Sequence, residues 1–485
     1  MTAEGYLRNF SPLKILSEEQ VEAIHRGSLE ILESTGIRFE SEKALEYLSK
    51  KGCKVDFSQH RVRFPSGLVE ECVCQAPSCF RLKGRTPDKD VNLGGNTLYF
   101  SPSPGMRTVD LDTWEQRVPT LEENHAAVRV LDALENIHLA CSYTPYCEIE
   151  NVSPNMVLPV SAYSRMKYFT KPQRVGTILN SHIWEIHMAE VVGIDVFGAM
   201  EAAPPLTWYK DAIDCAWACA EQGYPVEVGC GCVMGGTGPA TQAGALVQSN
   251  AEILSGIVLV ELIRPGTGIL ANSFVFAQNM RSGLPVAGGI EVSLFQVAFN
   301  QIWRGKYNLP TMLGACGPSN SKRIDIQLGY EKGVSSTLAA ISGASVINLH
   351  GGISVELTYH PVQSILDNDL AGMLGKLVKG ITVTPETLAL DLIQVVGPMP
   401  GHYLNTKHTR DWWKKEQYLP QVMDRTGYPD WLAGGKKSAL DLARAKMEKI
   451  LATHHPEQEL SQEQERELDR ILNEASAYYK ELEGK

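Results

Sequence analysis

The sequence predicts an α/β protein built on a closed (β/α)8 barrel, and two observations predict it. The first is a repeated unit, in which a short apolar run ends in Gly, Pro, Ser, Asn or His and a longer helical segment follows. Continuous apolar runs are typical of strands covered on both faces, and their alternation with helices implies parallel crossovers. The eight candidate strands are residues 97–104, 138–146, 174–181, 225–233, 266–275, 310–317, 345–352 and, more weakly, 380–385.

The second observation is that nucleotide-binding motifs are missing, which favours a closed barrel over an open doubly wound sheet. No G-x-G-x-x-G follows the first strand, and the sequence contains no Walker A pattern. The nearest stretch, GCGCVMGGTGPAT at 229–241, has a different spacing. We interpret it as a glycine turn before a helix, with a backbone-amide nest for an anion as the alternative.

Helical segments flank the predicted barrel on both sides. Ser17 and Gln20 have capping-box spacing at the start of an amphipathic segment that stops at Gly36. Near the other end of the chain, residues 436–453 and 461–482 form two charge-rich helical stretches. The sequence therefore predicts an N-terminal, mainly helical cap over 1–92, a barrel over 93–386 and a C-terminal helical extension over 387–485.

Composition excludes several classes of partner. The chain has 485 residues, of which 44% are hydrophobic and 21% charged, and its net charge is -11. This balance is typical of a globular protein. Nucleic acid and anionic membranes both require a clustered basic surface, and the sequence has no Lys/Arg block of useful length.

The distribution of apolar residues and cysteines predicts a cytoplasmic protein. The N-terminal residues have no apolar run of the secretory kind, and the most apolar run, 253–263, is short and contains Glu261. Most of the eleven cysteines lie inside apolar segments, which suits reduced thiols in a reducing compartment.

A (β/α)8 barrel has its active site at the carboxyl ends of its strands, so those ends supply the candidate residues. His350 follows the apolar strand SVINL, and Gly351 and Gly352 leave room beside it. The other candidates are Tyr99, Ser101, Pro102, Tyr143, Tyr146, Asn180, His182, Cys230, Cys232, Asn272, Phe274, Gln278 and Cys316.

These strand ends exclude some reaction classes by their composition. The sequence has no G-x-S-x-G or H-E-x-x-H motif, no predicted strand contains a Lys, and Glu227 is the only acidic residue in these strands. The sequence therefore predicts a neutral, aromatic mouth. Such a mouth suits a quaternary ammonium group, which donates no ordinary hydrogen bonds and is held by ring faces.

Two alternative interpretations of these residues stay open. A strand-end aromatic residue more often packs in the core or at the rim than against a ligand. Cys230, Cys232, Cys316 and His350 also form a candidate thiolate and imidazole set for zinc, although the sequence has no C-x-x-C.

Nearly the whole chain resembles the trimethylamine:corrinoid methyltransferase family, in its branch that lacks pyrrolysine. The resemblance rests on four stretches: IHRGSLEILESTGIRFES with RVRFPSGLVEECVCQAP, GGTGPATQAGALVQSNAEILSGIVLVELIRPG, DIQLGYEKGVSSTLAAISGASVINLHGG, and HYLNTKHTRDWWKKEQYLPQVMDR. It implies a (β/α)8 barrel that passes a methyl group from an amine to the cobalt of a separate corrinoid protein, with no tightly bound cofactor of its own.

The resemblance also bears on the substrate. Founding members contain pyrrolysine in a late strand, a position that falls within 330–350 here, whereas this chain contains only the ordinary twenty residues. A quaternary amine already has a good leaving group, so the resemblance implies glycine betaine first, then proline betaine, carnitine or γ-butyrobetaine. Tyr99, Tyr143 and Phe274 are expected near the ammonium, and His350 and Asn180 near the carboxylate.

Two further expectations follow. The partner is a cognate corrinoid protein that docks over the mouth, and the charged C-terminal helices suggest a homo-oligomer. The alternatives are a zinc-dependent corrinoid or thiol methyltransferase, a barrel lyase or aldolase, and a betaine-binding barrel without catalysis.

Overall fold

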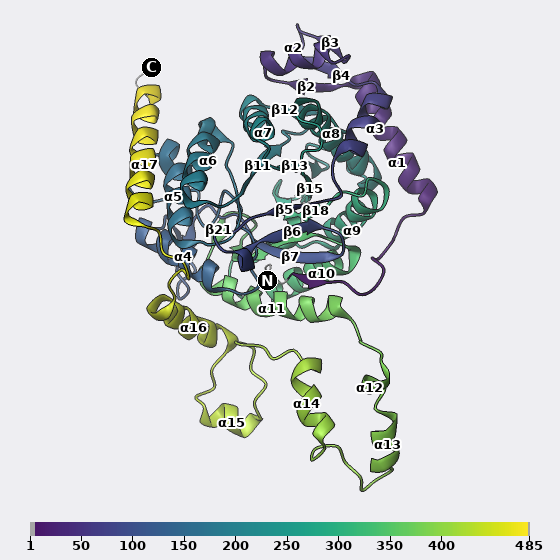
Figure 1. Cartoon of the computed structure of the whole chain (residues 1–485), viewed down its shortest axis with the longest axis vertical. Helices are drawn as coiled ribbons and strands as arrows, with labels where there is room; N and C mark the ends of the chain where they lie inside the picture. The colour runs from purple at the N-terminus through teal and green to yellow at the C-terminus, as the bar shows by residue number, and fades with distance from the viewer. Residues whose placement is uncertain (1–4, 484–485) are drawn as a thin grey trace.

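A closed barrel of parallel strands forms the centre of the computed structural model, which describes residues 5–483 (Figure 1). Its sheet has the strand order β1-β7-β19-β18-β15-β13-β11-β10. Residues 138–140 close the ring, because Ala140 bridges Gln173 and the His138 amide donates to the Phe100 carbonyl at 2.9 Å. The barrel strands are β7 Thr97–Pro102, β10 Gln173–Arg174, β11 Val196–Glu201, β13 Val226–Cys230, β15 Ile269–Ser273, β18 Thr311–Leu313 and β19 Val346–His350.

Each strand of the ring is followed by a helix on the outside of the barrel. Outward side chains such as Phe100, Val228 and Ile347 pack with these helices in the largest buried cluster. This alternation confirms the predicted (β/α)8 fold. The helices are α4 Leu121–Ala133, α5 Val157–Tyr168, α6 Ser181–Val192, α7 Lys210–Gln222, α8 Gln242–Ile263, α9 Ile290–Asn300, α10 Ile326–Ser342 and α11 Pro361–Lys379.

One of the eight predicted strands is wrong and one real strand was missed. Residues 380–384 form no strand, because α11 ends at Lys379 and the next element is the short helix α12 Pro385–Leu388. The missing strand is β11, whose sequence VFGAME contains Gly198 and ends on a charged residue, and so lacks the continuous apolar pattern of the others. Its identification matters because Glu201 lies at its carboxyl end.

The N-terminal cap begins with the helix that the capping-box spacing predicts. The backbone N–H of Gln20 donates to Ser17 Oγ at 3.3 Å, and the backbone N–H of Ser17 donates to Gln20 Oε1 at 2.8 Å. The elements of the cap are α1 Glu18–Glu30, α2 Glu42–Lys50, α3 Ser66–Gln75 and the strands β2 Ile37–Phe39, β3 Lys54–Asp56 and β4 Arg61–Arg63. Strand β12, Thr207–Trp208, pairs with β2 and so joins this sheet to the barrel.

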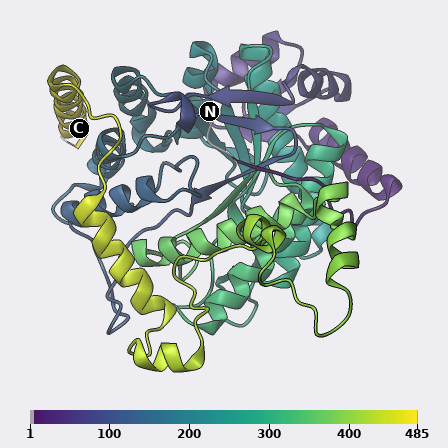
Figure 2. The ribbon, with the colours of Figure 1, turned by 60° about the horizontal axis from the view of Figure 1, so that its bottom comes forward.

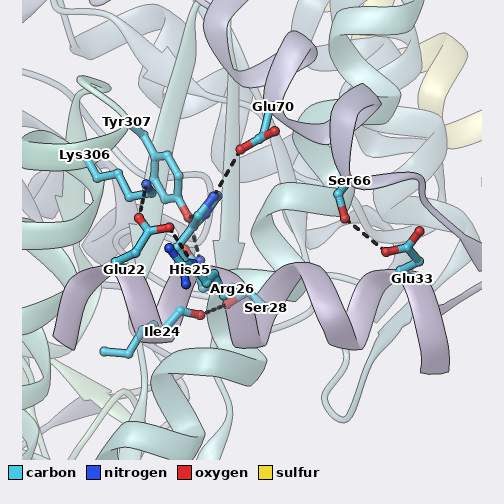
Figure 3. A network of polar contacts seen from close by, with 11 residues as sticks. Glu22, Ile24, His25, Arg26, Ser28, Glu33, Ser66, Glu70, Lys306 and Tyr307 are labelled. Carbon is cyan, nitrogen blue, oxygen red and sulfur yellow. Dashed lines mark hydrogen bonds and ion pairs between the residues drawn. The ribbon is translucent and has the colours of Figure 1, made fainter. Parts of the chain in front are cut away.

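A polar network fixes α1 against the barrel (Figure 3). Lys306, at the end of the π-helical turn Gln301–Lys306, donates to Glu22 Oε2 at 2.8 Å. His25 Nδ1 lies 2.9 Å from the Tyr307 hydroxyl, and its Nε2 lies 3.5 Å from Glu70 on α3. His25, Glu70, Lys306 and Tyr307 also line a small cavity of about 150 Å³. We interpret this network as a structural joint between the cap and the barrel.

The hairpin of β5 Cys79–Leu82 and β6 Val91–Gly94 closes the amino-terminal end of the barrel. Its side chains Leu82 and Leu93 share one buried cluster with the inward residues Tyr99, Phe197 and Met312. Strand β1, Tyr6–Leu7, pairs antiparallel with the start of β7 at the same end. The barrel therefore has a packed floor, and access to its interior is left to the carboxyl ends of the strands.

Helix α8 is, among the described residues, the one helix long and apolar enough to cross a membrane, with 78% of its most apolar window buried. It also contains the buried acidic residues Glu252 and Glu261. Burial in contact with the barrel strands explains its apolar composition, since a helix that is hydrophobic all round is a core helix in a large protein. Each of the eleven cysteines is a free thiol, as expected.

The C-terminal extension first leaves the barrel and then returns to it. Helix α16 packs on α4 and α11, and α17 packs on α5 and α6, so the two follow one flank of the barrel (Figure 2). The backbone N–H of Gln464 donates to Ser461 Oγ at 3.2 Å, which confirms the predicted helix start. The helices are α12, α13 Leu390–Val396, α14 Lys407–Glu416, α15 Tyr428–Ala433, α16 Ala439–Thr453 and α17 Gln462–Glu483.

The loops that follow the barrel strands contain short strands of their own. The hairpin of β20 and β21 joins β19 to α11, and its connecting residues 354–357 reach the mouth of the barrel. These short strands are β8 Thr108–Val109, β9 Gln116–Arg117, β14 Val233–Met234, β16 Phe276–Gln278, β17 Pro285–Val286, β20 Gly352–Ile353 and β21 Thr358–Tyr359.

Candidate active site

The inner face of the barrel changes from apolar to polar toward the carboxyl ends of its strands. Because side chains on a strand alternate between its two faces, residues two apart point to the same side. Three strands show this change in the same direction, from Tyr99 to Ser101 on β7, from Val346 to Asn348 on β19 and from Leu270 to Asn272 on β15. Polar side chains therefore gather at the end where (β/α)8 barrels hold their sites.

A cavity of about 460 Å³ opens above this polar layer. Its wall combines aromatic, charged, amide and apolar side chains from loops and strand ends. The aromatic residues are Tyr143 and Phe274, the charged residues are Arg174, Glu201 and Glu356, and the amide residues are Asn155, Asn272 and Asn348. Apolar residues such as Pro104, Met106, Leu158, Ile178, Leu179 and Leu357 complete it.

Arg174 is the centre of a buried ionic cluster beneath the cavity. Its Nη1 donates to Glu201 Oε1 at 2.8 Å and to Glu227 Oε2 at 2.5 Å, and its Nε donates to Ser142 Oγ at 3.3 Å. Asn272 donates to the other oxygen of Glu227 at 2.6 Å. The two carboxylates raise the pKa of Arg174 against the effect of burial. These bonds fix the guanidinium, and they use Nε and Nη1 rather than Nη2.

Tyr143 covers this guanidinium with its ring. The Arg174 Cζ lies 5.7 Å from the Tyr143 ring centroid, and the Tyr143 hydroxyl lies 3.0 Å from Thr177 Oγ1. Burial, with the charge of Glu201, raises the pKa of Tyr143, so its hydroxyl stays protonated. One edge of the ring is thus held by a hydrogen bond, and the side chain lines the cavity.

Glu356 enters the cavity from the loop between β20 and β21. Ser354 and Val355 just before it adopt positive φ values of 53° and 63°, an uncommon conformation for residues other than glycine. This turn directs Glu356 to the wall that Arg174 and Glu201 also line. Burial and the nearby carboxylate of Glu201 raise the pKa of Glu356 to about 7, although Arg174 opposes the shift.

Phe274 owes its place in the cavity wall to a glycine. A Cβ atom added at Gly231 would overlap the Phe274 ring. Gly231 belongs to the glycine-rich stretch that we interpreted as a turn or an anion nest, and in the structure it gives room to an aromatic ring.

Of the five predicted substrate-binding residues, Tyr143 and Phe274 line the cavity. Tyr99 lies one layer deeper in the packed floor, where its hydroxyl accepts a hydrogen bond from the Asn92 amide at 3.2 Å. Asn180 precedes α6 and donates to the Tyr478 hydroxyl of α17 at 3.2 Å, which places it in the contact with the C-terminal helix. Neither Tyr99 nor Asn180 is among the cavity-lining residues.

His350 does not line the cavity either, because a β-bulge changes the side to which it points. Asn348 pairs with Ser101 and His350 with Pro102, so that Leu349 is an extra residue in the strand. His350 packs against Phe100, with ring centroids 6.3 Å apart. The Phe100 side chain belongs to the layer between barrel and helices.

The surroundings of His350 keep its imidazole neutral. Burial and the charge of Lys332 lower its pKa well below the usual value. Gly351, which we expected to leave room for a ligand, has a φ of 89°, and a Cβ there would overlap the Tyr359 ring. This glycine therefore serves packing and backbone conformation.

The candidate zinc ligands also point away from the cavity. Cys230, Cys232 and Cys316 belong to the cluster between the barrel and its helices, and Cys230 Sγ lies 2.6 Å from Glu252 Oε2 on α8. Across residues 5–483, no group of three or more His, Cys, Asp or Glu side chains is placed to hold a metal ion.

The sequence pattern missed the charged residues of the cavity, and the predicted neutral mouth is wrong. Glu201 lies on the missed strand, and Glu356 lies in a loop with no strand pattern. Arg174 is the first residue of the predicted strand 174–181, and Asn348 lies inside the predicted strand 345–352, so neither was counted at a carboxyl end. Inward alternation, counted from the apolar floor residues, is the signal that could have found Arg174 and Asn348, whereas Asn272 was already among the strand-end candidates.

The barrel and the charged cavity at the carboxyl ends of its strands define a (β/α)8-barrel enzyme. The sequence pattern described as trimethylamine methyltransferase (MTTB) matches residues 1–476. The chain belongs to the trimethylamine methyltransferase (MTTB) family, and it is a methyltransferase.

Two curated relatives are similar over most of their length. The glycine betaine methyltransferase of Desulfitobacterium hafniense (strain Y51) is 33% identical, over 91% of this chain and 93% of the relative. The trimethylamine methyltransferase MttB of Desulfitobacterium hafniense (strain DSM 10664 / DCB-2) is 30% identical, over 91% and 90%. Among solved structures, the monomethylamine methyltransferase MtmB of Methanosarcina barkeri aligns with a TM-score of 0.47 and 10% identity, over 90% of this chain and 89% of that one.

Proposed function

We propose that this enzyme transfers a methyl group from a quaternary amine to Co(I) of a separate corrinoid protein, with glycine betaine as the first-choice substrate. The observation on which this proposal depends is the cavity, which combines three carboxylates, one guanidinium and two aromatic rings in one wall and floor. Proline betaine, carnitine and γ-butyrobetaine are the competing substrates of the same class.

The charge of the cavity favours a cation. Glu201, Glu227 and Glu356 surround a single guanidinium, so the site is negative when these carboxylates are ionised. The faces of Tyr143 and Phe274 add attraction for an ammonium group that donates no hydrogen bond, each about 0.5 to 2 kcal/mol. We place the trimethylammonium end of the substrate between these two rings.

The same wall can bind the carboxylate of a zwitterion. Arg174 is held in place by its Nε and Nη1 bonds, and Nη2 is the donor that those bonds do not use. Asn272 and Asn348 line the cavity beside it and contain amide groups. In glycine betaine one methylene separates the two charged ends, and a cavity of about 460 Å³ is in the size range of small-molecule sites.

The reaction is an in-line displacement at a substrate methyl carbon. The Co(I) electron pair forms the new carbon–cobalt bond, and the electron pair of the broken C–N bond stays on nitrogen. The products are methyl-Co(III) and a neutral tertiary amine. Because the nitrogen is already quaternary, no proton has to be supplied before it leaves, which is consistent with a chain that contains only the ordinary twenty residues.

Positioning is then the main contribution of the protein. The fixed charges of the cavity must tolerate the loss of positive charge from nitrogen, because a site that only stabilises the cation favours the ground state over the transition state. Two rings, in place of a complete aromatic box, attract the cation without stabilising the ground state too strongly.

The corrinoid protein must bring its cobalt to the mouth, and an apolar surface lies beside the strand ends. This surface consists of Met280 and Leu284 in the β16–β17 hairpin, Ile290 at the start of α9, and Ile326 and Tyr330 on α10, all of which are exposed. We place the docking partner there. A Co(I) reaction requires a reducing compartment, so we also place the enzyme in the cytoplasm.

A substrate panel tests the proposal. The purified chain is incubated with its reduced corrinoid protein, or with excess Co(I) cobalamin, and with glycine betaine, proline betaine, carnitine, γ-butyrobetaine, trimethylamine or dimethylamine. Conversion of the Co(I) spectrum to that of methyl-Co(III) is expected with glycine betaine. Consumption of trimethylamine alone would overturn the proposal, and so would betaine binding without methyl transfer.

A further inference from the structure

Residues 380–437 form an arm that leaves the barrel. Figure 1 shows α12, α13, α14 and α15 outside the ring of helices, joined to the rest by extended chain. From Gly380 to Gln421 no residue is buried. The arm starts at the end of α11, and it returns to α11 where the Tyr418 hydroxyl and the Gln421 amide donate to Asp369 at 3.2 and 2.9 Å.

The helices of the arm are too short to be stable without packing. Helices α12, α13 and α14 have 4, 7 and 10 residues, and none of their residues is buried. Isolated helices shorter than about 12 to 15 residues are marginal in water. The arm therefore needs a surface that its own chain does not provide.

The side chains of the arm indicate what kind of surface this is. Ile381, Val395, Met399 and Leu404 are 89%, 84%, 92% and 88% exposed, respectively. Large apolar side chains that are this exposed and this close together in sequence are typical of a surface that binds another protein. The other exposed apolar residues between 381 and 404 are Val383, Leu388, Leu390, Ile393 and Tyr403.

The place of the arm separates it from the mouth of the barrel. Helix α11 begins after the hairpin at the carboxyl end of β19, so it runs back to the floor of the barrel. The Asn9 amide donates to the Val378 carbonyl at 3.0 Å, and Lys379 Nζ lies 5.2 Å from the Tyr6 ring centroid, next to the first residues of β7. The corrinoid protein is placed at the mouth of the barrel. The arm thus leaves from the opposite end of the barrel.

We propose that this arm docks on a second copy of this chain. At roughly 100 Å² of apolar surface for each buried side chain, the nine exposed residues between Ile381 and Leu404 provide on the order of 900 Å². Two arms in a two-fold pair provide about 1,800 Å², which is the size of a stable protein interface. This inference does not depend on the identity of the substrate.

Matched substitutions of two methionines test the proposal. Met399→Glu places a charge on the arm, and Met280→Glu places the same charge at the mouth, where the methionine is 79% exposed. Because a carboxylate is costly inside an apolar interface, Met399→Glu should weaken self-association at least about tenfold in sedimentation equilibrium. Met280→Glu should leave self-association unchanged and weaken methyl transfer to the corrinoid protein.

Amide hydrogen exchange of the full chain gives a second measurement. Residues 381–404 should exchange slowly in the assembled wild type and quickly in Val395→Glu/Leu404→Glu, while far-UV circular dichroism and the melting temperature of the barrel stay close to wild type. A wild type that is monomeric at tens of micromolar would overturn the proposal. So would an arm that is protected only after the corrinoid protein is added.

Discussion

Arg174 and Glu227 form a buried ion pair in the centre of the barrel, with Nη1 2.5 Å from Oε2. Glu227 is fully buried, and Arg174 is 4% exposed. A buried carboxylate that loses its partner destabilises a protein by about 3 to 5 kcal/mol. The barrel therefore depends on keeping both partners, and the pair fixes the guanidinium that we place against the substrate.

Arg174→Lys separates these two roles. The substitution keeps the charge but loses the planar set of donors, so we expect kcat/KM to fall at least about tenfold while the fold persists. Arg174→Ala should in addition lower the free energy of unfolding by about 3 kcal/mol or more. The measurements are initial rates of methyl transfer and urea unfolding.

The control for Arg174 is Arg470→Lys on α17. Arg470 is 54% exposed and pairs with Glu467 and Glu474 at the surface. Exposed pairs contribute little, so its activity and stability should match wild type. Wild-type kinetics in Arg174→Lys would exclude the guanidinium from substrate binding.

Glu356 should make stability depend on pH. Its pKa in the folded protein is about 7, above the usual value of 4.5, because burial and Glu201 disfavour the carboxylate. The folded state then binds more protons than the unfolded state between these two values, so this group lowers the free energy of unfolding as pH rises from about 4.5 to 7. Glu356→Gln removes this contribution.

We therefore expect Glu356→Gln to gain stability relative to wild type across that pH window, with a constant difference above it. Urea unfolding at several pH values measures the difference in the free energy of unfolding. The contributions of the other acids with raised pKa values cancel in this difference, because both proteins contain them. Glu448→Gln, at an exposed position of α16, is the control and should follow wild type. A pH-independent difference between Glu356→Gln and wild type would contradict the assignment.

Gly231→Ala tests the position of Phe274. The added methyl group would overlap the Phe274 ring, so the ring must move out of the cavity wall. We expect kcat/KM for the quaternary amine to fall about tenfold, which corresponds to the binding free energy that one well-placed ring contributes. Gly329→Ala on α10, where the new Cβ meets no atom within 4 Å, should keep full activity. Equal activity of the two variants would remove Phe274 from the substrate contact.

His350→Ala and Asn348→Ala decide which residue of β19 serves the substrate. Asn348 lines the cavity and accepts a hydrogen bond from Ser101, so its loss should lower kcat/KM with little change in melting temperature. His350 packs behind the strand against Phe100, so its loss should lower the melting temperature and leave KM unchanged. The opposite pattern would support the direct role for His350 that the sequence predicts.

Much of the fold could be predicted from the sequence, because strands covered on both faces have a continuous apolar pattern. Seven of the candidate strand segments contain residues of the ring, from Thr97 in β7 to Val346 in β19. Strand β11 escaped the pattern because Gly198 and Glu201 interrupt it. The segment after α11 imitated a strand through Ile381 and Val383, whose side chains are exposed.

The site was harder to predict because it depends on which side of the wall each residue faces. Tyr143 and Phe274 were found because they lie near the carboxyl ends of predicted strands. The charged cluster was missed because ionic residues inside a barrel contradict the apolar pattern that locates its strands. Arg174 forms ion pairs with both Glu201 and Glu227, and that pairing is visible only in three dimensions.

The extra residue Leu349 has a consequence for how such enzymes diverge. One residue inserted after Ser101 in β7 would give Leu349 a partner, and plain alternation would then turn the imidazole of His350 inward, to the same side as Asn348. A change of a single codon in length thus suffices to bring a titratable ring to the cavity that Asn348 lines. Relatives that act on differently charged amines should be compared first at this strand.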